Sequence, residues 1–367
     1  MIIGIDAITV KSDGGVEHLT QILNNLSKNQ DIEKIFVWSN LENLEKINNN
    51  KVIKCSNKFI SFSNLTIFFW RLFFFGYYLK KNKCNILLCC SGYFIGFLNL
   101  KKILIFQNIL PFVSKGLKNK ILKTLYKISL NKADGIILLS QNSKSIILRN
   151  IKKHTTSIVI SHGVDERYFC AKNQNQNLNF LKNKLKLVYI STICDYKNQI
   201  NLLEALFILK KKGYNIQLDL IGNIDKKFKY FFYQKIKNLK LSKNINLIGH
   251  LAKDELVKIL KKNNVIIFPS KFETFGISLL ESMASSKLIL CSNKSAMPEI
   301  LGDAGLYFDP YNPDSISECI ENLFDKNFNY TEFTKKAYIK AKNYSWKKCS
   351  EETFNFIRFI NEKNFNN

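Results

Sequence analysis

The sequence predicts an α/β protein of two domains, each built on a parallel sheet that helices cover on both faces. Short apolar runs rich in Ile, Leu and Val alternate with longer helical patterns along almost the whole chain of 367 residues. The runs are apolar at consecutive positions, as expected of parallel strands buried on both sides. A polar stretch rich in Asn and Gln at 171–184 divides them into two series. A chain of this length is expected to form about two domains.

Each series supplies the strands of one sheet. The first predicts strands at 2–5, 35–38, 51–55, 86–90, 103–106, 135–139 and 157–160. The second predicts strands at 187–190, 216–221, 246–248, 265–268, 288–291 and 306–308. Helical spacing occurs between them at 16–26, 198–211, 254–262 and 278–285. We therefore expect an N-terminal domain over 1–170 and a C-terminal domain over 171–345.

The last segment, 331–362, is helical in pattern and rich in aromatic residues. Its final helix, at about 346–362, either caps the second domain or crosses back to pack on the first. Ligands of parallel α/β sheets bind beyond the carboxyl ends of the strands. Two sheets that face each other would therefore place the main site in a central cleft between the domains.

Composition excludes several classes of protein. With 46% hydrophobic residues, the chain is not disordered, collagen-like or a coiled coil over most of its length. The first residues have the pattern of a strand, so we expect no signal peptide, and no run of about 18 uncharged apolar residues predicts a transmembrane helix. Nine scattered cysteines without a Cys-x-x-Cys pair favour neither disulfides nor zinc, and indicate a reducing, cytoplasmic compartment.

The charge of the chain is unevenly distributed. The formal net charge is +26, and residues 51–150 hold 17 Lys and Arg residues but a single acid, Asp134. Such a region attracts phosphate-bearing surfaces, either an anionic membrane or a nucleic acid. The aromatic and basic stretch 67–81 within it has two interpretations: a helix packed in the core, or peripheral docking on a membrane.

Residues 268–284 carry the most informative motif. A strand ends at Phe268, a loop carries Glu273, Gly276 begins a helix, and Glu281 follows about one turn later. On one continuous helix the two carboxylates would lie about 80° apart, so Glu273 on the loop and Glu281 on the helix explain the spacing better. Both side chains then point into the space above the start of that helix.

This arrangement suits a nucleotide diphosphate-sugar. Backbone N–H groups at Gly276, Ile277 and Ser278, together with the helix dipole, form an anion site. The flanking carboxylates are poor phosphate ligands, but they are good acceptors for sugar hydroxyls. The alternative is that both acids simply favour the start of a helix, where Glu is common.

The surrounding sequence resembles the retaining glycosyltransferases of family four, the glycosyl transferases group 1. The most specific part is 270–305, and further matching pieces occur in the family's order over nearly the whole chain: 14–15, 133–140, 162–165, 189–192, 197–198, 249–251 and 308–310. The resemblance implies the GT-B architecture, which is two Rossmann-like domains around a cleft. The N-terminal domain would bind the acceptor, and the C-terminal domain the donor.

The resemblance also implies roles for individual residues. Lys197 would hold the donor diphosphate and stabilise its developing charge, and Glu273 would contact the transferred sugar. Glu281 would bind the ribose. The other donor-binding residues it implies are Gly14, Gly15, Thr192, Asn198, His250, Leu251, Phe275, Gly276 and Ile277. For the glycine pair the alternative is a plain strand-to-helix turn, and for His250 it is an ordinary surface position.

The chain departs from the family pattern at two places. Thr192 stands where many members have Arg, and Gln107-Asn108 stand where many have His. Neither Gln107 nor Asn108 can act as a general base, but a retaining front-side mechanism needs none, because the departing phosphate accepts the proton. Both would orient hydroxyl groups, with Tyr93 as a third acceptor-side residue. No Asp-x-Asp occurs, so we expect no metal and no cofactor besides the donor itself.

The sequence therefore predicts a retaining, metal-independent transferase that moves a hexose from a nucleotide diphosphate-sugar to a saccharide or lipid-linked acceptor. The expected setting is cell-envelope polysaccharide or lipopolysaccharide synthesis in the cytoplasm, with peripheral contact between 51–150 and an anionic membrane. The alternatives are an inactive sugar-nucleotide-binding partner of another transferase and an epimerase of the same fold. A nucleic-acid binder is disfavoured, because no regular basic and aromatic stripe occurs.

Overall fold

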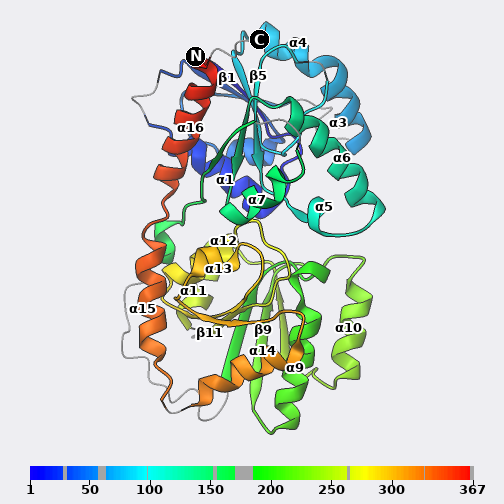
Figure 1. Cartoon of the computed structure of the whole chain (residues 1–367), viewed down its shortest axis with the longest axis vertical. Helices are drawn as coiled ribbons and strands as arrows, with labels where there is room; N and C mark the ends of the chain where they lie inside the picture. Colours follow the sequence, from blue (N-terminus) through cyan, green and yellow to red (C-terminus); the bar gives the residue numbers. More distant parts are fainter. Residues whose placement is uncertain are drawn as a thin grey trace. The chain divides into compact units, whose positions relative to one another are not determined.

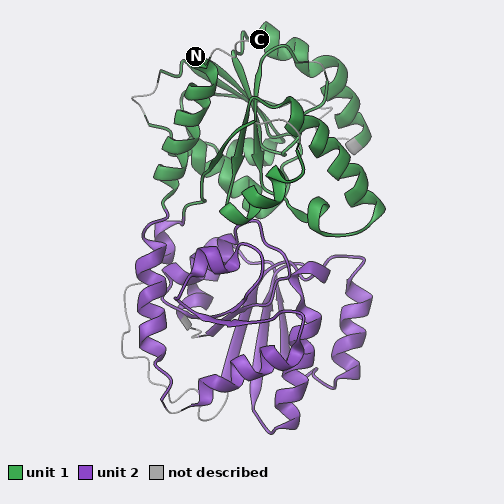
Figure 2. Ribbon diagram, in the orientation of Figure 1, with its two compact units in different colours: residues 1–163, 345–367 green, residues 164–344 purple. Residues whose placement is uncertain are grey.

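A computed structural model describes the chain except for residues 28–30, 57–62, 97, 152–154, 170–184, 263–264, 326 and 364–367. The predicted linker at 171–184 lies outside the described residues. The chain forms two compact units (Figure 2). Unit 1 comprises residues 1–163 and 345–367, and unit 2 comprises residues 164–344.

Unit 1 contains a parallel sheet of seven strands in the order β3-β2-β1-β4-β5-β6-β7 (Figure 1). The strands are β1 (Ile2–Asp6), β2 (Lys34–Trp38), β3 (Val52–Cys55), β4 (Ile86–Cys89), β5 (Lys101–Phe106), β6 (Gly135–Leu138) and β7 (Thr156–Val159). The helical segments are α1 (Asp13–Asn24), α2 (Leu41–Glu45), α3 (Asn64–Trp70), the π-helix η2 (Arg71–Phe75), α4 (Gly76–Lys81), α5 (Leu110–Val113), α6 (Leu117–Lys132), α7 (Gln141–Leu148) and α16 (Trp346–Glu362).

Consecutive residues of a strand point to opposite faces of the sheet. Since both sets are apolar in this sheet, helices cover both of its faces. On β4, Ile86 and Leu88 join one hydrophobic cluster, to which α1 and α16 also contribute. Leu87 and Cys89 join the other, together with residues of α3, α4 and α6. The two-sided apolar pattern of the strands is therefore explained by two separate cores.

Unit 2 contains a second parallel sheet, of six strands in the order β10-β9-β8-β11-β12-β13. Its strands are β8 (Leu185–Ile190), β9 (Ile216–Ile221), β10 (Ile245–Gly249), β11 (Val265–Phe268), β12 (Leu288–Ser292) and β13 (Leu306–Phe308). Its helical segments are η3 (Glu166–Tyr168), η4 (Asp195–Lys197), α9 (Gln199–Lys211), α10 (Lys229–Asn238), α11 (Lys253–Lys262), α12 (Ile277–Ala284), α13 (Met297–Leu301), α14 (Pro313–Glu321), η5 (Asn322–Phe324) and α15 (Tyr330–Ala341).

All thirteen predicted strands occur, and the predicted α/β class with two parallel sheets is confirmed. Strand ends differ by at most two residues. The largest differences are at β8, which begins at Leu185 instead of residue 187, and at β5, which begins at Lys101 instead of residue 103. The Lys101 ammonium group donates to the main-chain oxygens of Asn361 (2.6 Å) and Lys363 (2.8 Å), so a charged residue can occupy the start of a buried strand.

The predicted helical segment 331–362 forms two helices, α15 in unit 2 and α16 in unit 1. Ser345 begins α16 by accepting a hydrogen bond from the amide of Lys348. Helix α16 packs on α1, β4 and β5, all within unit 1.

The chain leaves unit 1 after Gly163 and returns to it at Ser345. At this point the two passages of the chain touch. A Cβ atom on Gly163 would lie only 2.1 Å from the main-chain nitrogen of Trp346. On the unit 2 side, the amide of Val164 donates to the oxygen of Tyr344 at 3.4 Å. Only glycine therefore fits at residue 163 without a shift of the main chain.

Candidate active site

Each sheet reverses its strand order at one central pair of strands. In unit 1 the order reverses between β1 and β4, and in unit 2 between β8 and β11. Doubly wound sheets bind ligands at this switch point, beyond the carboxyl ends of the strands. The predicted site residues of each unit follow strands of its sheet, some of them at this switch point.

Lys197 is positioned by the turn that follows β8. It ends the short helix η4, and Asn198 then takes a left-handed conformation (φ 63°) before α9 begins. The buried amide nitrogen of Asn198 donates to the main-chain oxygens of Pro269 (3.0 Å) and Pro310 (2.6 Å). Asn198 therefore ties the turn after β8 to the loop after β11.

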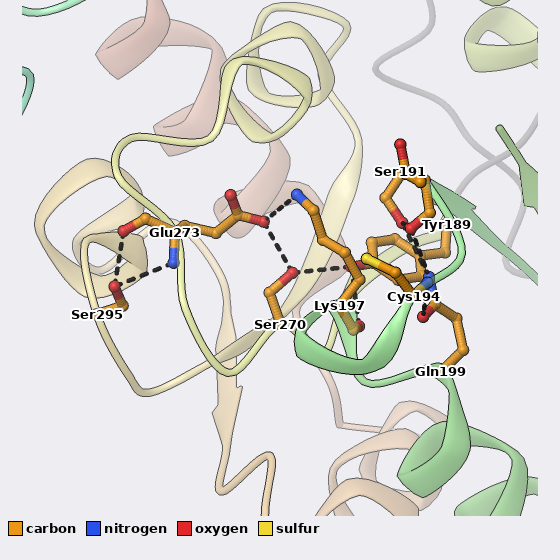
Figure 3. A network of polar contacts seen from close by, with 9 residues as sticks. Tyr189, Ser191, Cys194, Lys197, Gln199, Ser270, Glu273 and Ser295 are labelled. Atoms are coloured by element: carbon orange, nitrogen blue, oxygen red, sulfur yellow. Dashed lines mark hydrogen bonds and ion pairs between the residues drawn. The ribbon is translucent and has the colours of Figure 1, made fainter. Parts of the chain in front are cut away.

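Lys197 and Glu273 meet at this switch point (Figure 3). The ammonium nitrogen of Lys197 lies 2.5 Å from Oε1 of Glu273. Ser270 donates to the same oxygen at 2.8 Å, and its hydroxyl also shares a hydrogen bond of 2.8 Å with Tyr189. The Tyr189 hydroxyl in turn contacts the main-chain oxygen of Lys197 at 3.0 Å. The four residues form a closed network across β8 and β11.

The network is mostly shielded from solvent but not sealed. The Lys197 and Glu273 side chains remain 17% and 13% exposed. Burial alone would lower the pKa of Lys197, but the carboxylate of Glu273 and the neighbouring Tyr189 and Tyr196 raise it above its usual value. Lys197 is therefore a fixed cation. Burial also raises the pKa of Tyr196 to about 12, so this phenol stays neutral.

Ser295 holds the main chain of Glu273. Its hydroxyl accepts from the amide of Glu273 at 3.0 Å and donates to the carbonyl oxygen of the same residue at 2.6 Å. Figure 3 shows Ser295 on the opposite side of Glu273 from Lys197. Ser295 itself has a left-handed backbone (φ 60°), which is uncommon for a residue other than glycine.

Helix α12 begins directly after the Glu273 loop. Gly276 precedes it in a left-handed conformation (φ 98°), and within the described residues no side chain caps the helix. Its first amides are therefore available to an anion. Glu281 is half-buried on this helix, about one turn in. Phe275 is buried and packs 5.9 Å from the ring of Tyr344, so it can offer a ligand only its main chain.

Three other predicted donor residues of unit 2 follow the strands β8 and β10. Thr192 is exposed, and its main-chain oxygen accepts from Gln199 at 3.1 Å. His250, which is exposed, and Leu251 follow the edge strand β10. Gly249 before them has a φ of 83° and open space where a Cβ would be.

In unit 1 the prediction that Gly14 and Gly15 precede the first helix is wrong. Helix α1 begins at Asp13, and Ser12 caps it by accepting from the amide of Gly15 at 3.3 Å. The helix begins three residues earlier than the apolar pattern predicts, because a serine cap and the acid after it favour a helix start there. A Cβ on Gly15 would lie 3.4 Å from Oε1 of Gln107, so α1 and the end of β5 approach each other here.

The predicted acceptor-side residues follow β4 and β5. Tyr93 lies in the loop after β4, with its ring 4.8 Å from the guanidinium carbon of Arg71. The amide nitrogen of Gln107 is buried and has no hydrogen-bond partner among the described residues. Asn108 accepts from the amide of Leu110 at 3.0 Å, which starts the turn into α5. Gln107 therefore retains an unused donor at the carboxyl end of β5.

In the ranges that the structure describes, no group of three or more His, Cys, Asp or Glu residues is placed to hold a metal ion. The eight cysteines in these ranges are free thiols. None of the helices described is long and apolar enough to cross a membrane.

Sequence reasoning missed three residues of the site: Tyr189, Ser270 and Ser295. Tyr189 and Ser270 stand at the ends of β8 and β11, which pair in the sheet, so their strand-end positions were a usable signal. Ser295 is 22 residues from Glu273 in sequence, and its contact depends on how two loops fold together. No pattern in the sequence predicts that contact.

Two doubly wound units of this kind define the GT-B class of α/β protein. The structure resembles sucrose-phosphate synthase of Thermosynechococcus elongatus with a TM-score of 0.78 over 98% of this chain and 99% of that one, at 14% identity. It resembles HepE of Anabaena, solved with UDP-glucose, with a TM-score of 0.76 over 98% and 100% of the two chains, also at 14% identity. At such identities the likeness shows the shared fold.

The sequence of unit 2 matches a known family model. Residues 171–342, just under half of the chain, match the family described as glycosyl transferases group 1. O-antigen chain mannosyltransferase B of Escherichia coli is 31% identical over 32% of this chain and 30% of its own length. The capsular polysaccharide glycosyltransferase CapH of Staphylococcus aureus is 29% identical over 50% and 48%. The chain thus spans a third to a half of these relatives.

Proposed function

We propose that this protein transfers a hexose from a nucleotide diphosphate-sugar to a saccharide or lipid-linked saccharide, with retention of configuration and without a metal. The pairing of Lys197 with Glu273 at the switch point of unit 2 carries the proposal. A cation beside a carboxylate, next to an uncapped helix start, matches a ligand that has a diphosphate at one end and hydroxyl groups at the other.

The diphosphate would occupy the start of α12 and contact Lys197. The amides of Ile277 and Ser278 and the Lys197 ammonium group supply positive potential there. Glu273 would leave its ion pair with Lys197 and accept from hydroxyls of the transferred sugar. Glu281, one turn into α12, would accept from the ribose. The positive charge that a metal provides in other diphosphate sites would here come from Lys197 and the helix.

In the reaction, the bond from the sugar's anomeric carbon to the diphosphate oxygen breaks. A bond to the acceptor oxygen forms on the same face. The acceptor's proton passes to the departing phosphate, so no protein base is needed. Lys197 stabilises the charge that develops on the leaving group. This route agrees with Gln107 and Asn108 at the place where a histidine could act as a base.

The acceptor class is proposed from the relatives. The Escherichia coli and Staphylococcus aureus proteins are named for O-antigen and capsular polysaccharide synthesis. We assign this chain to the same kind of envelope polysaccharide or lipopolysaccharide assembly, on the cytoplasmic side of the membrane.

A membrane contact would be made by α3, η2 and α4. On one side of this segment Ile67, Trp70, Phe75 and Leu79 are buried, so part of the stretch does pack in the core. The other side exposes large hydrophobic residues followed by lysines: Leu65, Phe69, Phe73, Phe74, Tyr77, Lys80 and Lys81. Aromatic rings beside basic groups suit the interface of an anionic bilayer.

Donor binding and turnover test the transferase. Purified protein is screened against UDP-, GDP-, ADP- and CMP-sugars, with and without EDTA, by thermal shift and nucleotide release. We expect one donor class to stabilise the protein and to be hydrolysed slowly despite EDTA. Binding of several donors without turnover, even with lipid-linked acceptors, would favour the inactive partner. Inversion at C2 of the donor sugar would indicate an epimerase. If no donor binds, the proposal is wrong.

Vesicle binding tests the membrane contact separately. We expect the protein to sediment with phosphatidylglycerol vesicles, less so with phosphatidylcholine, and the Phe73→Ser/Tyr77→Ser variant to lose binding. A matched control, Tyr230→Ser/Phe231→Ser, removes two exposed aromatics from α10, which also carries lysines. Equal losses in both variants would refute a specific role for α3–α4.

A further inference from the structure

We propose that Arg71 is a positioning residue that holds the Tyr93 loop, residues 91–96, in place for the acceptor. This inference rests on the proposed function and adds to it a residue of unit 1 from the aromatic and basic stretch 67–81. Arg71 is the first residue of the π-helix η2 and is 1% exposed. Short π-helices in the middle of α-helices often occur at functional sites.

Arg71 reaches the carboxyl edge of the sheet at the switch point. It forms an ion pair with Asp6, the last residue of β1, whose side chain is also 1% exposed. The other oxygen of Asp6 accepts from the amide of Ile8 at 3.3 Å. The guanidinium group is therefore fixed to the end of β1, where strand order reverses toward β4.

The same guanidinium group holds the loop after β4. It donates to the main-chain oxygen of Tyr93 at 3.0 Å and lies 4.8 Å from the centre of the Tyr93 ring. Gly96, with a φ of 96°, lets this loop approach η2: a Cβ there would be 3.2 Å from the oxygen of Leu72. Arg71 thus joins β1, η2 and the Tyr93 loop through one side chain.

Simple stabilisation does not explain this choice of residue. A buried ion pair is often no more stabilising than well-packed apolar side chains of the same volume. In the part of the chain that the structure describes, Nε and Nη1 of Arg71 have no hydrogen-bond partner, which is a further cost. A buried arginine with this cost in stability is explained if its role is to fix the position of the Tyr93 loop. The loop that it orders carries Tyr93 beside the hydroxyl pair of Thr9 and Ser91, 2.5 Å apart.

The proposal separates two measurable properties, use of the acceptor and hydrolysis of the donor. Arg71 belongs to unit 1 and the Lys197–Glu273 network to unit 2. Disturbing Arg71 should weaken use of the acceptor while leaving donor binding and hydrolysis of the donor by water intact. A purely structural role would reduce both in parallel.

The test compares Arg71→Lys with wild type and with Arg149→Lys, the same substitution at an exposed residue of unit 1. Hydrogen–deuterium exchange is measured over 91–96, and transfer is measured to a mixture of octyl glycosides. We expect faster exchange in that loop only, and an acceptor KM raised about tenfold with donor KM and donor hydrolysis within twofold of wild type. Arg149→Lys should match wild type in every readout.

If Arg71→Lys fails to fold, hydrogen–deuterium exchange over 91–96 in Tyr93→Leu tests the same contact, because this variant removes the ring from the guanidinium group and keeps the main-chain acceptor. Its acceptor KM is not compared, since Tyr93 is itself a proposed acceptor-side residue. Unchanged loop exchange and acceptor KM in a folded variant would overturn the proposal, as would equal losses in donor hydrolysis and transfer. Absence of turnover by wild type on every donor would refute the proposed function, and with it the acceptor role. In that case, faster exchange of the loop in Arg71→Lys would show only that Arg71 stabilises the loop.

Discussion

The hydroxyl group of Ser295 forms two hydrogen bonds with the main chain of Glu273: it accepts from the amide at 3.0 Å and donates to the carbonyl oxygen at 2.6 Å. Ser295 thereby fixes the main chain of Glu273, while Lys197 and Ser270 bind Oε1 of its carboxylate. The position of the proposed sugar-binding group thus depends on Ser295, which contacts the main chain of Glu273 and not its carboxylate.

Ser295→Gly should lower turnover about tenfold and leave thermal stability nearly unchanged. Glycine adopts the left-handed backbone of residue 295 without strain, but it cannot hold Glu273. Ser295→Ala should lose as much activity and also some stability. The control is Ser286→Gly, a second serine with positive φ (54°), which should turn over donor like wild type. Full activity in Ser295→Gly would show that the hydrogen bonds between Ser295 and Glu273 are not needed for turnover.

Glu273→Gln should reduce donor hydrolysis about 100-fold, because an amide can neither balance Lys197 nor orient hydroxyls as a carboxylate does. Donor affinity should change only a few-fold, since the diphosphate contacts remain. Nucleotide release and calorimetric titration separate the two effects. The exposed Glu318→Gln serves as the matched control. A variant that keeps its turnover would remove Glu273 from the mechanism.

Lys197→Met should raise the donor Kd about tenfold or more and slow turnover further, because the site loses its fixed cation. Lys271→Met is the control on the neighbouring loop, where the ammonium group lies 3.3 Å from an exposed carboxylate of Asp195. Calorimetric titration with UDP, GDP, ADP and CMP compares the two. If both variants bind alike, Lys197 does not contact the diphosphate.

The stability of unit 1 should fall between pH 6.5 and 4 because of a buried histidine pair. Nδ1 of His18 lies 2.8 Å from Nδ1 of His162, and both rings pack near Trp346. Burial lowers the pKa of His18 from 6.5 to about 4, and it also lowers the pKa of His162. The unfolded chain therefore binds protons first as pH falls, so stability is complete above pH 6.5 and is lost toward pH 4.

His18 alone contributes about 3 kcal/mol to this loss on going from pH 7 to pH 4. In His18→Phe the melting temperature should depend less steeply on pH across that window, whatever the variant's stability at pH 7. Differential scanning fluorimetry at half-unit intervals measures the slope. Parallel curves for variant and wild type would contradict the assignment.

Gly163→Ala should destabilise unit 1 by about 3 kcal/mol, because the new Cβ would clash with main-chain atoms of Ser345 and Trp346, which cannot rotate away. Gly213→Ala is the matched control. Its φ of 89° costs about 1 kcal/mol of strain, but a Cβ there meets nothing within 4 Å. Thermal unfolding should rank wild type, Gly213→Ala and Gly163→Ala in that order, and a reversed order would refute the clash.

The fold was predictable because buried parallel strands have a local signature. Val265–Phe268 is an apolar run, Ile216–Ile221 is apolar at four of its six positions, and the predicted ends of both coincide with the observed strands. Lys197 and Glu273 lie in the turns that follow β8 and β11, so their place at the carboxyl edge of the sheet was predictable too. The features that could not be predicted are contacts between residues far apart in sequence. They are the hydrogen bonds between Ser295 and the main chain of Glu273, and the ion pair between Arg71 and Asp6, which are 65 residues apart.

The start of α1 illustrates a different limit. Apolar periodicity locates the middle of a helix well, but its first turn contains few apolar residues. Ser12, Asp13 and the two glycines carry a capping signal that periodicity ignores. Capping chemistry, read together with periodicity, would have placed Gly14 and Gly15 inside the helix.

The contact of Gly163 with Trp346 makes unit 2 an insertion in a discontinuous unit 1. The ends of the insert, Val164 and Tyr344, are hydrogen-bonded to each other, so residues 164–344 could be excised without stretching either product. A few residues would suffice to rejoin Gly163 to Ser345 and close unit 1 around α16. We therefore expect unit 2, and unit 1 rejoined in this way, to fold when they are expressed separately.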